Sequence, residues 1–363
     1  MKKHVIVGVI LIVTSALMLA LSCSDANGDS NNHESPPPAN FLFKDNLASV
    51  VNESVKLEIQ VNEKIKKLEL FYNDSLMKTW NNPNGKISHE LNTGEFGVGA
   101  RTLNLLSTRN DGSTFVDNRM VRVFSDIIPE KRIVSIIDQH PHDPTSFTQG
   151  LEFYEGRLYE GTGDPGNQGK TLVAEVNLIS GEKKQQIGLG VGYFGEGITI
   201  MDDLLYQLTW QNEKCYTYLI DSSLKLSGEF NYKGEGWGLC NNGASLIMSN
   251  GTERITYRNP KTFAIEKTIE VYNNHGPINY LNELEFIDGK IYANVWTTNM
   301  LVVIDPQTGK VLQEIDGTPL VRQGKGSGEV LNGIAHDSNT GKTYMTGKNW
   351  SKIFEVEFVV QGS

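Results

Sequence analysis

One nine-residue pattern recurs along the chain, as LEFYEGRLY at residues 151–159, ITIMDDLLY at 198–206 and LEFIDGKIY at 284–292. LCNNGASLI at 239–247 is a fainter copy, and residues 334–344 hold a copy that is two residues longer. Successive copies begin 41 to 50 residues apart. In each copy two apolar runs flank a tight turn, and two further short runs follow. Four-stranded units repeated about every 45 residues are typical of β-propeller blades, so the sequence predicts five blades.

The two ends of the repeat region complement each other. After the fifth copy only one more strand-like run, FEVEF at 354–358, precedes the end of the sequence. The run RIVSII at 132–137 stands before the first copy and matches a fourth strand. We expect this run to pair with the last unit and close the ring, because closure leaves no large unpaired edge. An open solenoid is the alternative, and it would not need this strand. Residues 129–363 are therefore assigned to a five-bladed β-propeller.

Residues 41–128 carry a different β pattern. Apolar and polar residues alternate over 55–61, which places the apolar ones on one face of a strand. NNPNG at 81–85 and NDG at 110–112 are hairpin turn signals. Several short strands in a segment of this length predict a small immunoglobulin-like β-sandwich without a cluster of catalytic residue types. The expected fold class is all-β, a five-bladed propeller preceded by this sandwich, which we interpret as a spacer or docking module.

The beginning of the sequence has the pattern of an export signal. Two lysines precede an apolar run over 5–21, and small residues then lead to Cys23. This pattern predicts a lipoprotein signal peptide over 1–22, with Cys23 as the lipidated first residue of the mature protein. An uncleaved anchor helix is the alternative. Residues 23–40 are polar and rich in Asn, Ser and Pro, which predicts a disordered tether.

Composition and charge limit the partners. The chain of 363 residues is 39% hydrophobic and carries a formal net charge of −10, with a pI near 5.3. An acidic chain of this kind is not expected to bind nucleic acid through phosphate contacts. We expect an exported monomer, either anchored to the bacterial outer membrane through a lipid on Cys23 or located in the periplasm or at the cell surface. The lipid would be its one contact with the membrane.

Equivalent positions in the five repeats hold candidate functional residues. In a propeller, the loops that enter the first strand and leave the second open on one face around the axis. Two residues before each first strand stand Gln149, Glu196, Trp237, Asn282 and Asn332. Where each second strand ends stand Gly163, Trp210, Gly251, Trp296 and Lys348. Structural positions in repeats tend to repeat, whereas these differ in type from one unit to the next, which suggests a function. Packing for the tryptophans and solvation for the glutamate remain the alternatives.

The cysteines and histidines give weaker signals. Three cysteines are too few for a disulfide framework. The sequence does not decide whether Cys215 and Cys240 form a disulfide or remain two buried thiols. His140 and His142 lack further clustered ligands, so a structural loop is favoured over a metal site. Neither a phosphate-binding loop nor a nucleophile elbow is present in the sequence. No cofactor and no metal ligand are therefore predicted.

The residues at these positions belong to longer motifs, which follow in chain order. They are FTQGL (147–151), YEGTG (159–163), FGEGIT (194–199), LTW (208–210), GEGWGL (234–239), LNELEF (281–286), NVW (294–296) and TGKNW (346–350). Together they resemble the plant-type glutaminyl-peptide cyclotransferase (glutamine cyclotransferase) family, which also occurs in bacteria. The resemblance spans about residues 132–358 and implies a bacterial member with an added N-terminal domain.

The resemblance also implies an activity and a set of site residues. Family members are five-bladed propellers that convert N-terminal glutaminyl residues of peptides or proteins to pyroglutamyl residues, with release of ammonia and without a catalytic metal. The propeller would then be the catalytic domain, with Glu196 as the acid/base and Lys348 as a second candidate catalytic residue. The substrate-binding residues implied are Phe147, Gln149, Phe194, Trp210, Trp237, Asn282 and Trp296.

The residue types suit this chemistry. The α-amine attacks the substrate's own side-chain amide, and one carboxyl group with a raised pKa can move the proton from the amine to the leaving ammonia. Lys348, Asn282 or Gln149 would supply donors to the oxyanion, and the sequence leaves the choice among them open. The competing readings are a non-catalytic propeller lipoprotein that binds a peptide or glycan and a metal-dependent lactonase-like propeller.

Overall fold

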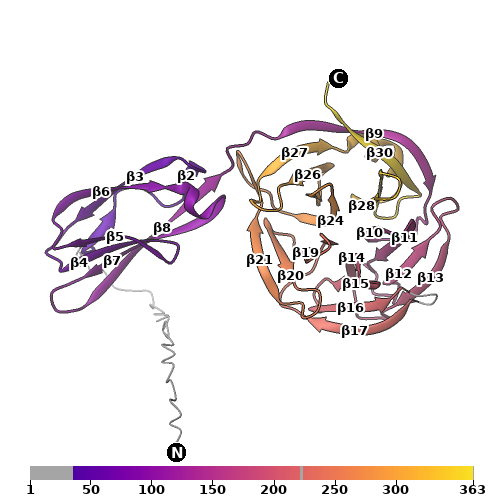
Figure 1. The fold of residues 1–363 in the computed structure, drawn as a ribbon, viewed down its shortest axis with the longest axis horizontal. Coiled ribbons are helices and arrows are strands. Elements are labelled where there is room, and N and C mark those ends of the chain that lie inside the picture. Colours follow the sequence, from indigo (N-terminus) through magenta and orange to yellow (C-terminus); the bar gives the residue numbers. More distant parts are fainter. Residues whose placement is uncertain (1–35, 221–223, 363) are drawn as a thin grey trace, which may run out of the picture. The chain divides into compact units, whose positions relative to one another are not determined.

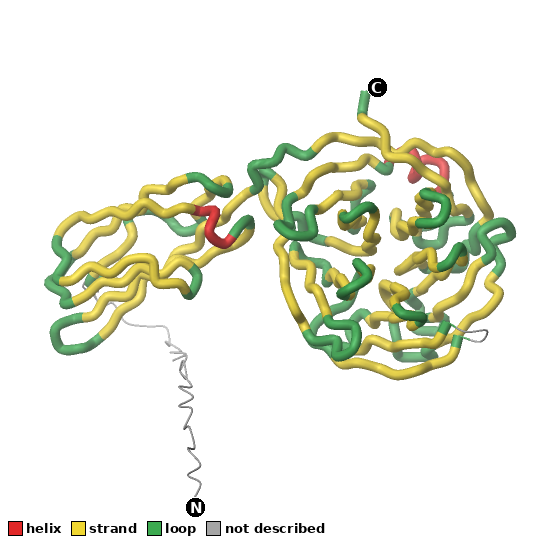
Figure 2. The backbone as a smooth tube through the Cα atoms, viewed as in Figure 1, coloured by secondary structure: helices red, strands yellow, loops and turns green. Residues whose placement is uncertain are grey.

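The computed structural model describes residues 36–220 and 224–362. Within these ranges the fold is all-β, and the helical elements are a 3-10 helix, Thr93–Phe96, and the short helix α1 (Thr318–Gly324) (Figure 2). In the described part of the chain, no helix has the length and apolar character needed to cross a membrane. The predicted signal peptide and Cys23 lie outside the described residues.

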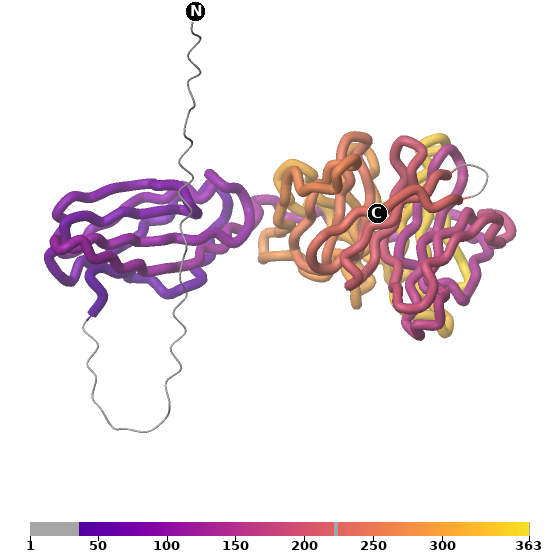
Figure 3. The backbone as a smooth tube through the Cα atoms, turned by 90° about the horizontal axis from the view of Figure 1, so that it is seen from below, coloured from indigo at the N-terminus to yellow at the C-terminus, as the bar shows by residue number. Residues whose placement is uncertain are grey.

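The N-terminal region consists of two sheets. One has the order β1-β3-β6 and the other the order β2-β8-β7-β4-β5, in which β2 runs parallel to β8. The sheets bury one core between them, to which Leu57 and Ile59 of β3 and Leu68 and Leu70 of β4 contribute. Figure 3 shows the backbone of these sheets in indigo and purple. The strands are β1 (Ala39–Phe41), β2 (Leu47–Val50), β3 (Ser54–Val61), β4 (Lys67–Tyr72), β5 (Ser75–Asn81), β6 (Gly85–Asn92), β7 (Gly99–Thr108) and β8 (Thr114–Phe124).

Each of the first four sequence repeats folds into a set of four antiparallel strands. In Figure 1 these sets surround a common centre, with β10, β14 and β24 innermost and β13, β17 and β27 at the rim. The first two sets are β10 (Thr148–Tyr154), β11 (Arg157–Thr162), β12 (Leu172–Val176) and β13 (Lys183–Gly188), then β14 (Gly195–Met201), β15 (Leu204–Thr209), β16 (Lys214–Leu219) and β17 (Lys225–Asn231). The next two are β18 (Leu239–Asn241), β19 (Leu246–Ser249), β20 (Arg254–Arg258) and β21 (Ile265–Glu270), then β24 (Leu281–Ile287), β25 (Lys290–Val295), β26 (Met300–Ile304) and β27 (Val311–Asp316). The hairpin β22 (Tyr272–Asn273) and β23 (Gly276–Pro277) precedes the fourth set.

The last set is completed by a strand from before the first repeat, as the sequence predicts. It consists of β28 (Leu331–Asp337), β29 (Lys342–Gly347), β30 (Lys352–Val360) and β9 (Glu130–Pro141). β9 pairs antiparallel with β30, with Ile136 opposite Val356. The start of β9 also pairs in parallel with β27, so two sets form one eight-stranded sheet. The ring is therefore closed by strands from the two ends of the repeat region.

Hydrophobic cores fill the spaces between successive sets. Val173 of the first set and Ile198 of the second belong to one cluster of buried side chains. Further clusters join the second set to the third, the third to the fourth and the fourth to the fifth. Another joins Ala335 of the last set to Leu151 of the first. This cyclic packing gives a propeller-like arrangement with the first strands around the axis.

Candidate active site

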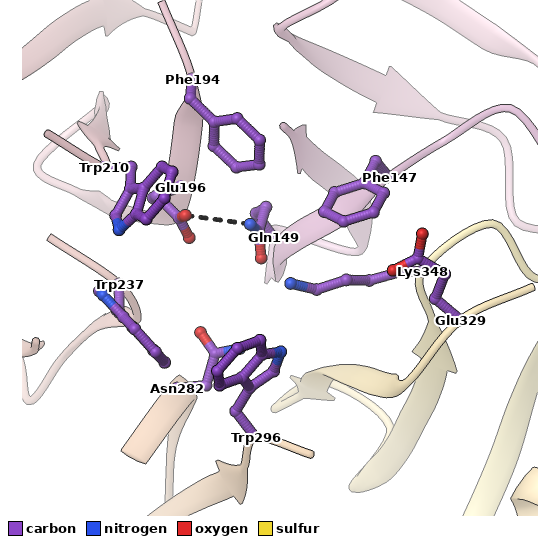
Figure 4. Close-up of a pocket in the computed structure, with 10 residues that line it drawn as sticks. All are labelled: Phe147, Gln149, Phe194, Glu196, Trp210, Trp237, Asn282, Trp296, Glu329 and Lys348. Carbon is purple, nitrogen blue, oxygen red and sulfur yellow. Dashed lines mark hydrogen bonds between the residues drawn. The ribbon is translucent and has the colours of Figure 1, made fainter. Parts of the chain in front are cut away.

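Ten of the described residues line one cavity of about 190 Å³ (Figure 4). They are Phe147, Gln149, Phe194, Glu196, Trp210, Trp237, Asn282, Trp296, Glu329 and Lys348. The structure thus brings together all nine residues named from the sequence and adds Glu329. Three other repeat positions, Gly163, Gly251 and Asn332, do not line the cavity.

Local irregularities in the first strands position three of the polar side chains. The pairing register shifts at Gln149 in β10, at Glu196 in β14 and at Asn282 in β24. A fourth shift, in β28, lies at Asn332. A β-bulge re-aims a side chain, and bulges are frequent beside active sites. In four of the five repeats, the varying position before the first strand is therefore a position where the strand pairing is interrupted.

Glycines that directly follow two of the site residues allow the first strands of neighbouring sets to lie close together. A Cβ atom at Gly197, directly after Glu196, would stand 2.5 Å from the backbone nitrogen of Leu239 in the neighbouring set. Gly238, directly after Trp237, makes a similarly close approach to the backbone of Asn282. Larger residues would push the first strands apart and widen the cavity floor.

Glu196 lies at the floor of the cavity with only 5% of its surface exposed. The Gln149 side-chain amide donates a hydrogen bond to Glu196 Oε1 at 3.0 Å, and Asn332 in turn donates to Gln149 Oε1 at 3.3 Å. Burial raises the pKa of the Glu196 carboxyl well above its usual range; the charge of Lys348 opposes this rise and that of Glu235 adds to it. A carboxyl with a raised pKa holds a proton more readily than an ordinary glutamate and can accept and return one during a reaction.

Lys348 enters the cavity from the opposite side, where its loop is held by the backbone of a neighbouring segment. Its N–H donates to Val330 O at 3.0 Å, and its carbonyl accepts from Glu329 N at 2.7 Å. The ammonium nitrogen lies 4.8 Å from the ring centroid of Phe147. Burial lowers the pKa of Lys348, and the charges of Glu196 and Glu329 offset only part of this fall. This places a cationic donor across the cavity from a protonatable carboxyl.

Aromatic rings form the walls. Phe194 contacts both Phe147 and Trp210 edge-on, with ring centroids 6.0 and 5.7 Å apart. On the other side Trp237 and Trp296 meet at 90° with centroids 5.4 Å apart. These contacts leave a slot between two aromatic clusters, which suits a planar amide group.

A buried ion pair anchors the segments that carry Phe147 and Lys348. His142 Nδ1 lies 2.7 Å from Trp350 O, and its Nε2 lies 2.9 Å from Glu160 Oε1. Thr148 also donates a hydrogen bond to Glu160, at 2.7 Å. Burial lowers the pKa of His142, but the charge of Glu160 and the hydrogen bonds outweigh it, so the pKa is raised. His142 is therefore part of a structural clamp, the role that the sequence favoured over a metal ligand.

This clamp predicts a pH-dependent stability. Because the pKa of His142 is raised on folding, its stabilising effect is complete below the unfolded value of about 6.5 and is lost as the pH rises through the folded value. We expect His142→Ala to lower the free energy of unfolding by about 3–5 kcal/mol at pH 6, the usual effect of breaking a buried pair. The difference from the unsubstituted protein should shrink at higher pH. Denaturant unfolding at several pH values checks this, with the exposed His275→Ala as control; a pH-independent difference would contradict it.

The described residues that line the cavity do not form a cluster of metal ligands. Glu196 and Glu329 are the carboxylates among them, without His, Cys or Asp. Elsewhere in the described ranges, Asp138, His140 and Glu355 place ligand atoms within 4.8 Å of one another, on the outer strands β9 and β30. Cys215 and Cys240, left open by the sequence, are buried free thiols.

Comparisons with known proteins identify the family of this chain. The family model described as glutamine cyclotransferase matches residues 115–358 and so begins within β8. The chain is 35% identical over 231 residues to a glutaminyl-peptide cyclotransferase of Arabidopsis thaliana, covering 62% of this chain and 71% of the relative. The crystal structure of Myxococcus xanthus glutaminyl cyclase superposes with a TM-score of 0.60 at 35% identity, covering 64% of this chain and 99% of that one. The chain therefore belongs to the glutamine cyclotransferase family.

Proposed function

We propose that this chain is a glutaminyl-peptide cyclotransferase that converts N-terminal glutaminyl residues of peptides or proteins to pyroglutamyl residues and releases ammonia. The observation that carries the proposal is the buried Glu196, with its raised pKa, in an aromatic cavity opposite Lys348. The names of its relatives in Arabidopsis thaliana and Myxococcus xanthus support the same activity.

The proposed mechanism needs one proton carrier. The substrate's α-amine, with a free pKa near ~8, is partly neutral at physiological pH and attacks the carbon of its own side-chain amide. The Glu196 carboxylate accepts the proton that the attacking nitrogen loses. When the bond between that carbon and the amide nitrogen breaks, Glu196 returns the proton and the nitrogen leaves as ammonia. The ring amide forms, and the carboxylate is regenerated.

The developing oxyanion needs donors that are not already engaged. The Gln149 amide donates to Glu196, whereas among the described residues neither the Lys348 ammonium nor the side-chain amide nitrogen of Asn282 donates a hydrogen bond. Lys348 and the Asn282 amide group are thus the donors proposed for the oxyanion. The aromatic walls exclude water and hold the side-chain amide in line with the attacking amine.

We further propose a metal-independent reaction, because one carboxyl and one ammonium supply the proton transfer and the charge stabilisation. Residues 129–363 would be a five-bladed β-propeller and residues 41–128 an immunoglobulin-like sandwich, as the strand sets and the cyclic cores support. Export and lipid attachment at Cys23 are also proposed, on the sequence pattern alone; fatty-acid labelling that persists in Cys23→Ser would contradict the attachment.

A direct assay tests the function. The purified protein, incubated with a short peptide that begins with Gln, is expected to release ammonia and to give a product lighter by one ammonia. A chelator should leave the rate unchanged. The same peptide with an acetylated α-amine is the control, because it lacks the nucleophile and should not react. If no ammonia forms at micromolar enzyme, the chain is not a cyclotransferase, and peptide binding without turnover would favour the non-catalytic alternative.

A further inference from the structure

Glu235 lies between two of the tryptophans that line the cavity, but Glu235 itself is not part of the lining. The indole N–H groups of Trp210 and Trp237 both donate to Glu235 Oε2, each at 2.9 Å. Gln211 donates its side-chain amide to Oε1 at 3.0 Å. In Figure 4 the ring nitrogens of Trp210 and Trp237 are turned toward the same side, away from the centre of the cavity. One carboxylate therefore holds the outer edge of two walls.

The chemistry of these contacts requires a strong acceptor and favours an anion. An indole N–H can only donate, so two of them converge only on an atom that accepts twice. Burial raises the pKa of Glu235, but the hydrogen bonds from Gln211, Trp237 and Trp210 outweigh it and lower the pKa. The group is then a carboxylate at neutral pH, and its hydrogen bonds are of the stronger, charge-assisted kind.

The contacts extend from Glu235 to both aromatic clusters. Trp210 packs on Phe194, and Trp237 packs at 90° on Trp296. A shift of either indole would therefore move a second ring of the wall. The ionisable groups that act on Glu196 are Lys348 and Glu235. The pKa of Tyr232 is raised mainly by burial, and the charge of Glu196 adds to this rise. Of these groups, Glu235 contributes a negative charge from outside the cavity lining, where it is bonded to the two tryptophans.

We propose that Glu235 is a positioning residue of this site, whose carboxylate fixes the indoles of Trp210 and Trp237 as the walls that hold the reacting amide. The identity of that amide rests on the proposed function. The second consequence is electrostatic: removal of the Glu235 charge lowers the pKa of Glu196, because a like charge nearby disfavours the ionised carboxyl.

Two variants separate position from charge. Glu235→Ala removes the acceptor, and we expect kcat/KM to fall about 10- to 100-fold, as for lost hydrogen bonds to a charged acceptor, with KM raised. Glu235→Gln keeps an accepting oxygen of the same reach and should restore most of KM. The acid limb of its kcat/KM profile should still move to lower pH. Tryptophan fluorescence should change in Glu235→Ala and return toward the original spectrum in Glu235→Gln.

Glu213→Ala is the matched control. Glu213 is also partly exposed and accepts from Lys233 at 2.7 Å and from Gly234 N at 3.0 Å, in the same loop region, but it accepts no hydrogen bond from Trp210 or Trp237, whose indoles donate to Glu235. Its kinetics should equal those of the unsubstituted protein. Unchanged KM and fluorescence in a folded Glu235→Ala variant would overturn the positioning role, and an unmoved acid limb in Glu235→Gln would overturn the electrostatic consequence. Inactive unsubstituted protein would instead refute the proposed function, and the fluorescence comparison would still test the positions of the indoles.

Discussion

Replacing Glu196 by glutamine is expected to lower kcat by about 10²- to 10⁴-fold, the range typical of losing general acid–base catalysis. The amide has the size of the carboxyl and can still accept the hydrogen bond from Gln149, so the cavity keeps its shape. It cannot carry a proton from the attacking amine to the leaving ammonia. KM should therefore change much less than kcat. Steady-state kinetics with a Gln-initiated peptide measure both constants.

Glu283→Gln is the matched control for this substitution. Glu283 is as buried as Glu196 and burial also raises its pKa, but its oxygens accept the backbone N–H groups of Leu151 at 3.3 Å and Ile334 at 2.9 Å. We expect a lower melting temperature and nearly unchanged kcat. If both variants lost turnover equally, the effect would come from the packing around the axis and not from proton transfer. Full turnover in a folded Glu196→Gln variant would refute the mechanism.

The repeat could be recognised in the sequence because the same local structure recurs in each copy. Each copy is a hairpin, and the turns at Glu155-Gly156 and Asp288-Gly289 have positive φ at both central residues, as two-residue hairpins require. The same spacing located Gln149, Glu196 and Asn282, since each stands at the bulge before the apolar run. Alignment of the copies thus predicted which positions share the face around the axis.

Other parts of the site depend on contacts that no local pattern encodes. Phe147 and Phe194 were identified only from the family resemblance. The alignment of the repeats compared other positions, two residues before each first strand and at the end of each second strand. Glu329 follows α1, which has no helical counterpart in the described parts of the other repeats and whose sequence signal is Pro319 in its first turn. Its place beside Lys348 is set by backbone hydrogen bonds between segments about twenty residues apart. The bonding of Glu235 to two indoles likewise appears only in the structure, because Trp210 lies 25 residues away in the sequence.

Replacing Lys348 by methionine is expected to lower kcat by about 10²- to 10³-fold, the usual effect of removing one oxyanion donor. Methionine preserves most of the aliphatic stem that passes Phe147 but has no hydrogen to donate. The loss should fall on kcat, because the charge that Lys348 stabilises is present only as the amide carbon becomes tetrahedral. A rise in KM with unchanged kcat would instead assign Lys348 to substrate holding.

Chemical rescue makes this test specific to the ammonium group. Lys348→Cys, treated with 2-bromoethylamine, regains an amine at the length of a lysine side chain and should recover a large share of kcat. Cys215 and Cys240 are buried, and burial raises the pKa of both thiols, so they should react slowly under conditions that modify an accessible cysteine. Because Cys23 is a third cysteine of the chain, mass spectrometry of peptides would locate the added groups as well as count them. A folded protein modified at residue 348 without recovered turnover would show that the loss in Lys348→Met did not come from the missing cation.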